Sequence, residues 1–379
     1  MNYYLLISLI FATLSGLFSL TRQLQMLQQN SYFPSRYTSW LKDNLPHLNI
    51  VFFFIVSVLF NLGFDFVLMA VTLLTAAINI RIAVRTQKSS IKKLVFTGRI
   101  KRLFGCALII FVLLLGVYIA IPKTLTSKIS VAVIWILAYA SPLLTYICWA
   151  LTLPIEKAFS RWYINDAKRI LKQHKDLKVV GITGSYGKTT TKFILTRILS
   201  EKYNVVCTPQ SFNTPMGVVR TIREKLQPQT EIFVCEMGAK NIGDIKEICD
   251  IVNPDYALIT SVGAQHLETF KTVDNVFKTK FELADAVLAK KGKVLANLDS
   301  LEIKTRADNK TVISYGTDEQ HTYTAKNITC NRYGSEFDVC VENETIKLNT
   351  RLLGMHSIIN ITGAAGLAYE LGLSAEEIR

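Results

Sequence analysis

Acidic side chains are nearly absent from the first part of this 379-residue chain. Residues 1–152 hold thirteen Lys or Arg but only Asp43 and Asp65, so they carry +11 of the net charge of +14. In the remaining 227 residues, 30 basic side chains nearly balance 27 acidic ones. The basic pI therefore belongs to the first segment and is not the footprint of a nucleic-acid-binding protein, so no nucleic-acid partner is expected.

Paired cysteines are also missing. The seven cysteines are scattered, odd in number and without a C-x-x-C pair, which indicates neither a zinc site nor a disulfide framework. Met1 to Leu20 lacks the basic start and the small-residue cleavage site of a signal peptide. We therefore expect free thiols and a first apolar segment that is retained.

Long apolar runs dominate the first segment. They cover Tyr3–Leu20, Ile50–Ile80, Leu103–Ile121 and Val131–Leu153. A membrane-spanning helix needs about 20 apolar residues, and the second run is interrupted at Gly63-Phe64-Asp65, which suggests a hairpin of two short helices. The prediction is a helical membrane bundle over residues 1–153, with five spans near 3–20, 50–64, 66–80, 103–121 and 131–153.

The loop between Arg81 and Arg102 is basic and has no acid, which predicts an inner-side loop in a multi-pass cell-membrane protein. Five spans then place the N-terminus outside and the chain after Leu153 in the cytoplasm, with the lipid bilayer as a partner. Two roles remain open for the basic loop: it fixes topology only, or it contacts anionic lipid or a lipid-linked pyrophosphate. Asp65 is either an intramembrane functional charge or part of a polar turn.

A glycine-rich loop follows an amphipathic connector at residues 154–178. Residues 178–192 read K-V-V-G-I-T-G-S-Y-G-K-T-T-T-K, the pattern of a strand, a turn and the start of a helix. Such a loop closes backbone N–H groups around phosphate, Lys188 adds a positive charge, and the Thr189 hydroxyl can ligate Mg²⁺. The spacing matches the short G-x-x-G-K-T form, since Ile182 stands where the longer phosphate loop has glycine. A structural glycine turn is the alternative.

Three further segments follow in order and carry a family resemblance. Phe233–Gly238 reads F-V-C-E-M-G, Thr260–Phe270 reads T-S-V-G-A-Q-H-L-E-T-F, and Lys280 lies fourteen residues after His266. With the T-G-S-Y-G-K-T-T string, these segments resemble the central ATP-binding domain of the Mur ligases, which build the cell-wall stem peptide. Within that family they are most similar to the branch that adds D-alanyl-D-alanine. The resemblance covers roughly Val179 to Arg379.

The resemblance implies an ATP-dependent ligase that activates a carboxylate as an acyl phosphate, which an amine then attacks. Lys188 would hold the β- and γ-phosphates, Thr189 and Glu236 one Mg²⁺, and His266 a second Mg²⁺, with Lys280 carbamylated as a further oxygen ligand. The implied catalytic residues are Lys188, His266 and Lys280, and the implied nucleotide contacts are Gly184, Ser185, Tyr186, Gly187, Lys188, Thr189, Thr190 and Asn360. The alternatives are a capping role for Glu236, a structural His266 and a solvated Lys280.

Two more segments resemble ligand-contacting parts of the family. Gln210–Gly217 resembles the loop beside the acceptor peptide, where Asn213 and Thr214 would bind it; a plain turn is the alternative. Gly354–Ala365 resembles the helix beside the adenine, but Ser357 stands where the family has Asn, which leaves Asn360 as the candidate. Tyr186 also departs from the Asn that is frequent in the family, and it could stack over the nucleotide.

The expected organisation is a membrane domain at 1–153, the connector at 154–178, and a P-loop α/β domain of the Mur ligase central type at 179–379. Apolar strands at Val179–Ile182, Ile232–Cys235, Tyr256–Thr260 and Gly292–Asn297 alternate with helical segments and predict a mostly parallel sheet, with a β-rich stretch at Thr311–Thr350. The family's C-terminal ligase domain is expected to be missing.

The expected partners are a muropeptide acceptor and an amino-acid or dipeptide amine such as D-Ala-D-Ala. The rival functions are a Mur-like ligase for another envelope polymer, such as poly-γ-glutamate, and an inactive ATP-binding membrane scaffold.

Overall fold

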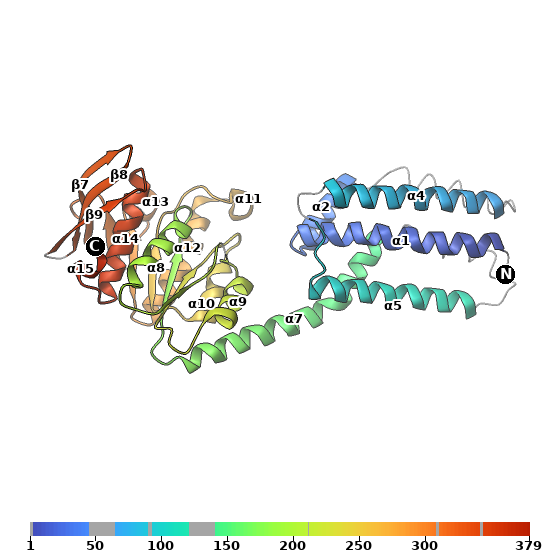
Figure 1. Cartoon of the computed structure of the whole chain (residues 1–379), viewed down its shortest axis with the longest axis horizontal. Coiled ribbons are helices and arrows are strands. Elements are labelled where there is room, and N and C mark those ends of the chain that lie inside the picture. The colour runs from blue at the N-terminus through green and yellow to red at the C-terminus, as the bar shows by residue number, and fades with distance from the viewer. Residues whose placement is uncertain are drawn as a thin grey trace. The chain divides into compact units, whose positions relative to one another are not determined.

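The computed structural model describes residues 3–44, 65–89, 93–120, 141–210, 212–307, 311–341 and 344–379 (Figure 1). The chain divides into two compact units, Met1–Phe159 and Ser160–Arg379.

Unit 1 is helical in its described part. Its helices are α1 (Tyr3–Gln29), α2 (Pro34–Asn44), α4 (Asp65–Ser89), α5 (Gly98–Ala120) and the first part of α7 (Ser141–Gln173). Leucines one helical turn apart on α1, Leu20, Leu24 and Leu27, are buried against Tyr37 of α2 and against α5. A polar contact lies within this packing, since the Tyr37 hydroxyl donates a hydrogen bond of 2.7 Å to Gln23 Oε1.

Within the described part of the chain, none of the helices has the length and the apolar character that a membrane crossing requires. The prediction of membrane spans is therefore wrong for the described helices, and the membrane location and bilayer partner that rested on it are corrected with it. The expected span at 50–64 and the start of the one at 131–153 lie outside the described residues.

Two of these helices, α1 and α7, do not end where the apolar runs end. Helix α1 continues past Leu20 through Arg22 and Gln23, and α7 continues through Pro154 and Glu156 to Gln173. Charged and amide side chains therefore share one continuous helix with the apolar ones.

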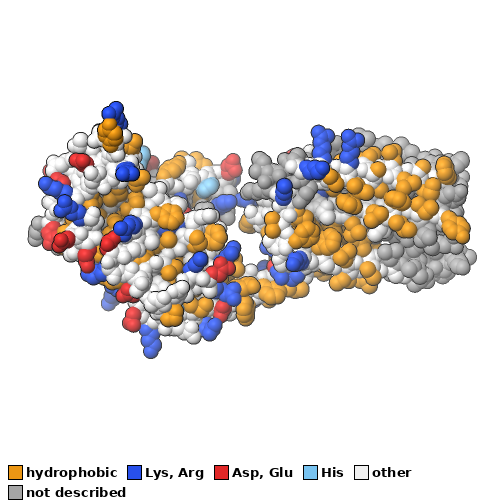
Figure 2. Space-filling view, viewed as in Figure 1, with side chains coloured by type: hydrophobic (Ala, Val, Ile, Leu, Met, Phe, Trp, Pro, Cys, Tyr) orange, Lys and Arg blue, Asp and Glu red, His pale blue; other side chains and the backbone are white. Residues whose placement is uncertain are grey.

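Figure 2 shows that hydrophobic side chains cover much of the visible face of unit 1, while charged side chains of both signs are spread over unit 2. Ile109, Val112 and Leu113 of α5 are each more than 60% exposed. On this face of unit 2, the nearly balanced basic and acidic side chains of the second part of the chain are therefore dispersed and do not form a patch of one sign.

Unit 2 is built on one nine-stranded sheet with the order β2-β3-β1-β4-β5-β6-β7-β8-β9. The strands are β1 (Lys178–Thr183), β2 (Val205–Cys207), β3 (Ile232–Glu236), β4 (Tyr256–Ile259), β5 (Lys293–Asn297), β6 (Ile313–Gly316), β7 (Tyr323–Asn331), β8 (Gly334–Val341) and β9 (Glu344–Thr350). Pairing is parallel from β2 to β7 and antiparallel from β7 to β9. The predicted parallel sheet and the β-rich stretch after it are confirmed.

Helices cover both faces of this sheet (Figure 1). They are α8 (Lys188–Leu199), α9 (Pro215–Lys225), α10 (Asp244–Val252), α11 (Leu267–Phe270), α12 (Val273–Ala289), α13 (Leu301–Lys304), α14 (Met355–Glu370) and α15 (Ala375–Ile378). Successive strand residues point to opposite faces. Val179 therefore packs with α9, α10 and α12, whereas Val180 packs with α8 and α14.

Helix α14 approaches the sheet closely because it carries glycine where the tyrosines of two strands lie. A Cβ on Gly363 would meet the ring of Tyr315 at 2.6 Å, and one on Gly366 would meet the ring of Tyr323 at 2.6 Å. This approach places the first turn of α14 beside the carboxyl end of β5.

We expect Gly366→Ala to lower the free energy of unfolding by about 1–3 kcal/mol, because the added methyl group forces the packed Tyr323 ring to move. Chemical denaturation followed by circular dichroism measures the change. The matched control is Gly105→Ala in α5, where nothing lies within 4 Å of the new Cβ. The control variant should unfold with the same free energy as the parent, or with one that is higher by up to about 1 kcal/mol. Equal stability of Gly366→Ala and the parent would contradict the close approach.

Candidate functional site

The glycine-rich loop joins the end of β1 to the start of α8. Its two glycines have positive φ angles, 153° at Gly184 and 82° at Gly187. A Cβ at Gly184 would lie 2.0 Å from Thr260 Oγ1, so only glycine fits there. The Ser185 amide donates to Ser261 O at 2.7 Å, and the Thr260 hydroxyl donates to Tyr186 O at 2.6 Å. The loop is thus fixed against the segment that follows β4.

Glu236 is the last residue of β3, and its carboxylate is 1% exposed. Three side chains donate hydrogen bonds to it. The Thr189 hydroxyl and the Lys192 ammonium reach Oε2 at 2.9 and 3.0 Å, and the Asn213 amide reaches Oε1 at 3.0 Å. A buried carboxylate needs such partners, because removing its charge from water without a partner costs on the order of several kcal/mol.

Lys188 is folded back onto the loop that precedes it. Its ammonium donates to the carbonyl oxygens of Gly184 at 2.6 Å and Ser185 at 3.1 Å. Burial lowers the pKa of Lys188, and the negative charge of Glu236 opposes this lowering. The ammonium therefore contacts the loop at the amino end of α8 and is within reach of the charge of Glu236.

Lys280 is buried on α12, with 1% of the residue exposed. Burial, with the positive charge of Lys188 as the second cause, lowers the pKa of Lys280 to about 7. A substantial fraction of this side chain is therefore a neutral amine near pH 7. The alternative of a solvated Lys280 does not fit this burial.

His266 precedes α11 and has a left-handed backbone, with φ at 54°. Burial lowers the pKa of His266, and the positive charges of Lys280, Lys240 and Lys188 act in the same direction. This electrostatic effect indicates a basic environment common to His266, Lys280 and Lys188. A neutral imidazole there is free to act as a ligand or a hydrogen-bond partner.

A pocket of about 500 Å³ opens beside the glycine-rich loop. Its lining residues are Tyr186, Gly187, Thr260, Ser261, Asn297, His356, Ile359 and Asn360. Asn360 of α14 lies close to the loop, since a Cβ on Gly187 would be 2.7 Å from its Nδ2. The size suits a small planar ligand, and the lining includes the exposed ring of Tyr186 and the side-chain amides of Asn297 and Asn360.

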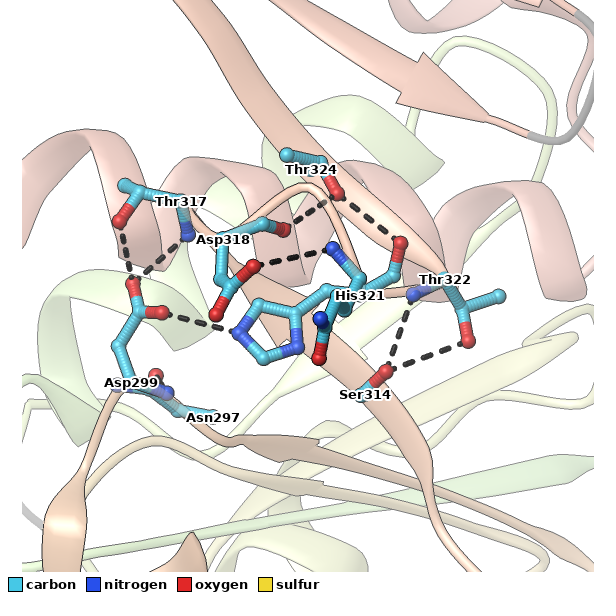
Figure 3. Close-up of polar contacts among 9 residues, drawn as sticks. Asn297, Asp299, Ser314, Thr317, Asp318, His321, Thr322 and Thr324 are labelled. Carbon is cyan, nitrogen blue, oxygen red and sulfur yellow. Dashed lines mark hydrogen bonds and ion pairs between the residues drawn. The ribbon is translucent and has the colours of Figure 1, made fainter.

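A network of hydrogen bonds around Asp299 fixes the segment after β5, which forms part of the pocket wall (Figure 3). Asn297 Oδ1 accepts from the Asp299 amide at 3.0 Å. The Asp299 carboxylate accepts from the Thr317 amide at 2.7 Å, from the Thr317 hydroxyl at 2.9 Å, and from His321 Nε2 at 3.0 Å. These bonds fix the turn that presents Asn297 to the pocket.

The structure brings together several of the residues that the sequence singled out. Lys188, Thr189, Asn213 and Glu236 form one cluster, and Tyr186, Gly187 and Asn360 line the pocket. The Ser185 hydroxyl has a structural partner, since its Oγ accepts a hydrogen bond from the Gly263 amide at 3.1 Å.

Two predicted residues lie at the margin of the cluster. Thr190 is exposed in the first turn of α8. Thr214 caps α9, where its Oγ1 accepts from the Gly217 amide at 3.4 Å.

Sequence reasoning missed Lys192, Asn297, Ser261 and His356. Lys192 could have been found, because it lies four residues after Lys188 and so on the same face of a helix. Asn297, Ser261 and His356 come from separate elements. Ser261 and His356 lie within segments that carry the family resemblance, and Asn297 ends a predicted strand, but these strings do not single out the three side chains. Only the folded sheet places them beside the loop.

Comparison with known proteins agrees with this geometry. Residues 182–368 match the model of the Mur ligase middle domain. The UDP-N-acetylmuramoyl-tripeptide–D-alanyl-D-alanine ligase of Bacillus subtilis is 28% identical over 205 residues, which are 54% of this chain and 44% of that protein. The same enzyme of Escherichia coli is 29% identical over 213 residues, which are 55% of this chain and 47% of that protein. The chain thus spans about half the length of the curated relatives it matches.

Solved structures show the same likeness. MurF from Acinetobacter baumannii matches with a TM-score of 0.53 and 27% identity, over 58% of this chain and 48% of that one. MurF ligase from Thermotoga maritima in complex with ADP matches with a TM-score of 0.52 and 27% identity, over 58% of this chain and 51% of that one. The phosphate loop and the buried Glu236 therefore lie within residues 182–368, the segment that is similar to the Mur ligase middle domain.

Proposed function

We propose that unit 2 is the ATP-binding part of an ATP-dependent ligase that forms an amide bond. The observation that carries this proposal is the cluster of Lys188, Thr189 and Glu236, with Glu236 buried and held by three donors beside the phosphate loop. A positive charge, a hydroxyl and a carboxylate at the amino end of a helix are the groups that phosphoryl transfer requires. The Mur ligase relatives support the same reaction class.

ATP would bind with its phosphates on the loop and its adenine in the neighbouring pocket. The backbone amides of residues 184–187 and the amino end of α8 suit the phosphates, and Lys188 would exchange its two carbonyl partners for phosphate oxygens. Tyr186 and Asn360 lie where a planar base would stack and bond. The Thermotoga maritima relative was solved in complex with ADP, which supports a nucleotide as the ligand.

The reaction would proceed in two steps. An oxygen of the acceptor carboxylate attacks the γ-phosphorus, the bond to the β–γ bridging oxygen breaks, and ADP leaves. The amine nitrogen then attacks the acyl carbon, inorganic phosphate leaves, and the amine proton is lost to a base. Both steps build negative charge, which Lys188 is placed to stabilise.

The residues present fit Mg²⁺. A carboxylate has about four acceptor sites on its two oxygens, and Glu236 uses three of them for Thr189, Lys192 and Asn213. Thr189 and Glu236 would hold the ion through hard oxygen ligands, and His266 with a Lys280 carbamate would hold a second one. When bound, Mg²⁺ neutralises phosphate charge and orients the γ-phosphate.

Lys280 is suited to carbamylation because a carbamate forms from CO₂ and a neutral amine. Its pKa of about 7 provides that neutral amine near physiological pH. The modification would replace a buried cation by an anion beside Lys188 and His266. The positive charges of Lys188 and Lys280 both lower the pKa of His266, and that of Lys188 lowers the pKa of Lys280, so an anion at Lys280 would relieve an excess of positive charge.

We further propose a muropeptide acceptor and an amine of the D-Ala-D-Ala class. The relatives are named for a UDP-N-acetylmuramoyl-tripeptide and D-alanyl-D-alanine. Asn213 and Thr214 would contact the acceptor, since Asn213 lies next to the carboxylate that neighbours the reaction centre.

Lys188→Ala should lower the rate of ATP hydrolysis in the presence of a muropeptide acceptor by roughly 100- to 1,000-fold, because it removes the charge that stabilises the transferred phosphoryl group. The measurement is phosphate release by the full chain. Arg197→Ala, at an exposed position on the same helix, is the matched control and should retain the parent rate. Unchanged activity in Lys188→Ala would favour the rival function of an inactive ATP-binding scaffold.

The Lys280 carbamate should depend on both pH and CO₂. With a pKa of about 7, lowering the pH from 8 to 6 reduces the neutral amine roughly tenfold, so carbamate occupancy should fall with pH. Carbon-13 NMR of the chain in labelled bicarbonate would detect the carbamate, and Lys280→Arg should lack the signal. Lys278→Arg, at an exposed position on the same helix, is the control that should keep it. A signal that persists in Lys280→Arg would refute the assignment.

A further inference from the structure

Lys192 is buried at the junction of three elements of unit 2. It is 0% exposed, and it lies on α8 one turn after Lys188. Its ammonium donates to Glu236 Oε2 at 3.0 Å and to the carbonyl oxygen of Gln210. It also lies 4.5 Å from the centre of the Phe193 ring. One side chain thus contacts both the carboxylate at the end of β3 and the connection between β2 and α9.

The β2–α9 connection also contacts Glu236 directly, through residues at both of its ends. Asn213 donates to Glu236 Oε1 at 3.0 Å, and Asn213 O accepts from the Gly238 amide at 2.8 Å. Thr208 Oγ1 accepts from the Glu236 amide at 3.1 Å. Glu236 is therefore surrounded by this connection on one side and by α8 on the other.

We propose that Lys192 is a positioning residue that couples the β2–α9 connection to the carboxylate of Glu236. Without Lys192, Gln210 loses the ammonium that binds its carbonyl, and Glu236 loses the cation that balances it. The carboxylate and Asn213 would then no longer share one fixed arrangement. This inference rests on the proposed function in that Glu236 and Asn213 are the residues proposed to meet the metal ion and the acceptor.

The geometry distinguishes this role from direct contact with ATP. Lys188 extends toward the loop carbonyls of Gly184 and Ser185, whereas Lys192 extends toward Gln210 and Glu236. The ammonium of Lys192 is fully enclosed and has partners already. It acts on ligands through Glu236 and Asn213.

The first test is hydrogen exchange in the full chain without nucleotide. Lys192→Met keeps the length and apolar stem of the side chain but removes its charge. Exchange at the amides of Phe212 and Gly238 should rise at least about tenfold, as expected for the loss of a hydrogen bond to a charged group. Arg197→Met, on the exposed face of α8, is the matched control and should leave both amides at the parent rate.

The second test is the Mg²⁺ dependence of ATP hydrolysis. Partners that orient a metal ligand typically change metal affinity by roughly 10- to 100-fold. Lys192→Met should raise the half-saturating Mg²⁺ concentration by this factor, while kcat at saturating Mg²⁺ stays close to that of the parent. A loss of kcat with an unchanged Mg²⁺ requirement would overturn the positioning role, because it indicates direct contact with the reacting groups.

Lys192→Met leaves a buried carboxylate unbalanced, so a second variant protects the test against misfolding. Lys192→Met combined with Glu236→Gln removes both charges. If the single variant loses protection at Leu295 and Ala296 of β5, the double variant replaces it in the exchange measurement. Fast exchange at Phe212 in that variant supports the proposal, and parent-like protection overturns it.

The two levels of the proposal fail separately. If the parent chain does not bind or hydrolyse ATP, the proposed function is refuted. The exchange rates at Phe212 and Gly238 still decide whether Lys192 couples the connection to Glu236, because they are measured without nucleotide.

Discussion

The buried carboxylate of Glu236 is the constraint on which the site depends. A negative charge removed from water requires partners that are present before any ligand arrives. Those partners come from α8 and from the β2–α9 connection, while Glu236 itself ends β3. Because one carboxylate binds all of them, the phosphate loop helix and the connection must fold into a single arrangement.

The parallel sheet makes that arrangement possible. The carboxyl ends of neighbouring parallel strands lie on one edge, where ligands of open α/β sheets bind. Gly184 follows β1, Glu236 ends β3, Thr260 follows β4 and Asn297 ends β5. Segments far apart in the sequence thereby become neighbours, and α14 closes the pocket above them through its glycine contacts with the sheet tyrosines.

Local patterns in the sequence predicted what depends on neighbouring residues. The phosphate loop, Glu236 and the strands of the sheet follow from short strings with a definite chemistry. Asn297 and His356 did not, because their roles arise from tertiary contacts. The spacing of Lys192 from Lys188 places it on the same helix face, but its partners Gln210 and Glu236 appear only in the folded chain. The membrane spans were predicted from apolar runs alone and were wrong in the described helices. An apolar run does not mark where a helix ends, since α1 and α7 continue into polar sequence.

The position of Lys188 has a consequence for the kinetics and heat of ligand binding. Its ammonium already makes two hydrogen bonds to Gly184 and Ser185, so the free loop carries an internal cation in contact with its carbonyls. The Lys188 ammonium has to leave these two carbonyl oxygens before it can pair with an incoming phosphate. The enthalpy gained from the new ion pair is then reduced by the two bonds that are broken, and association includes a side-chain rearrangement as well as diffusion.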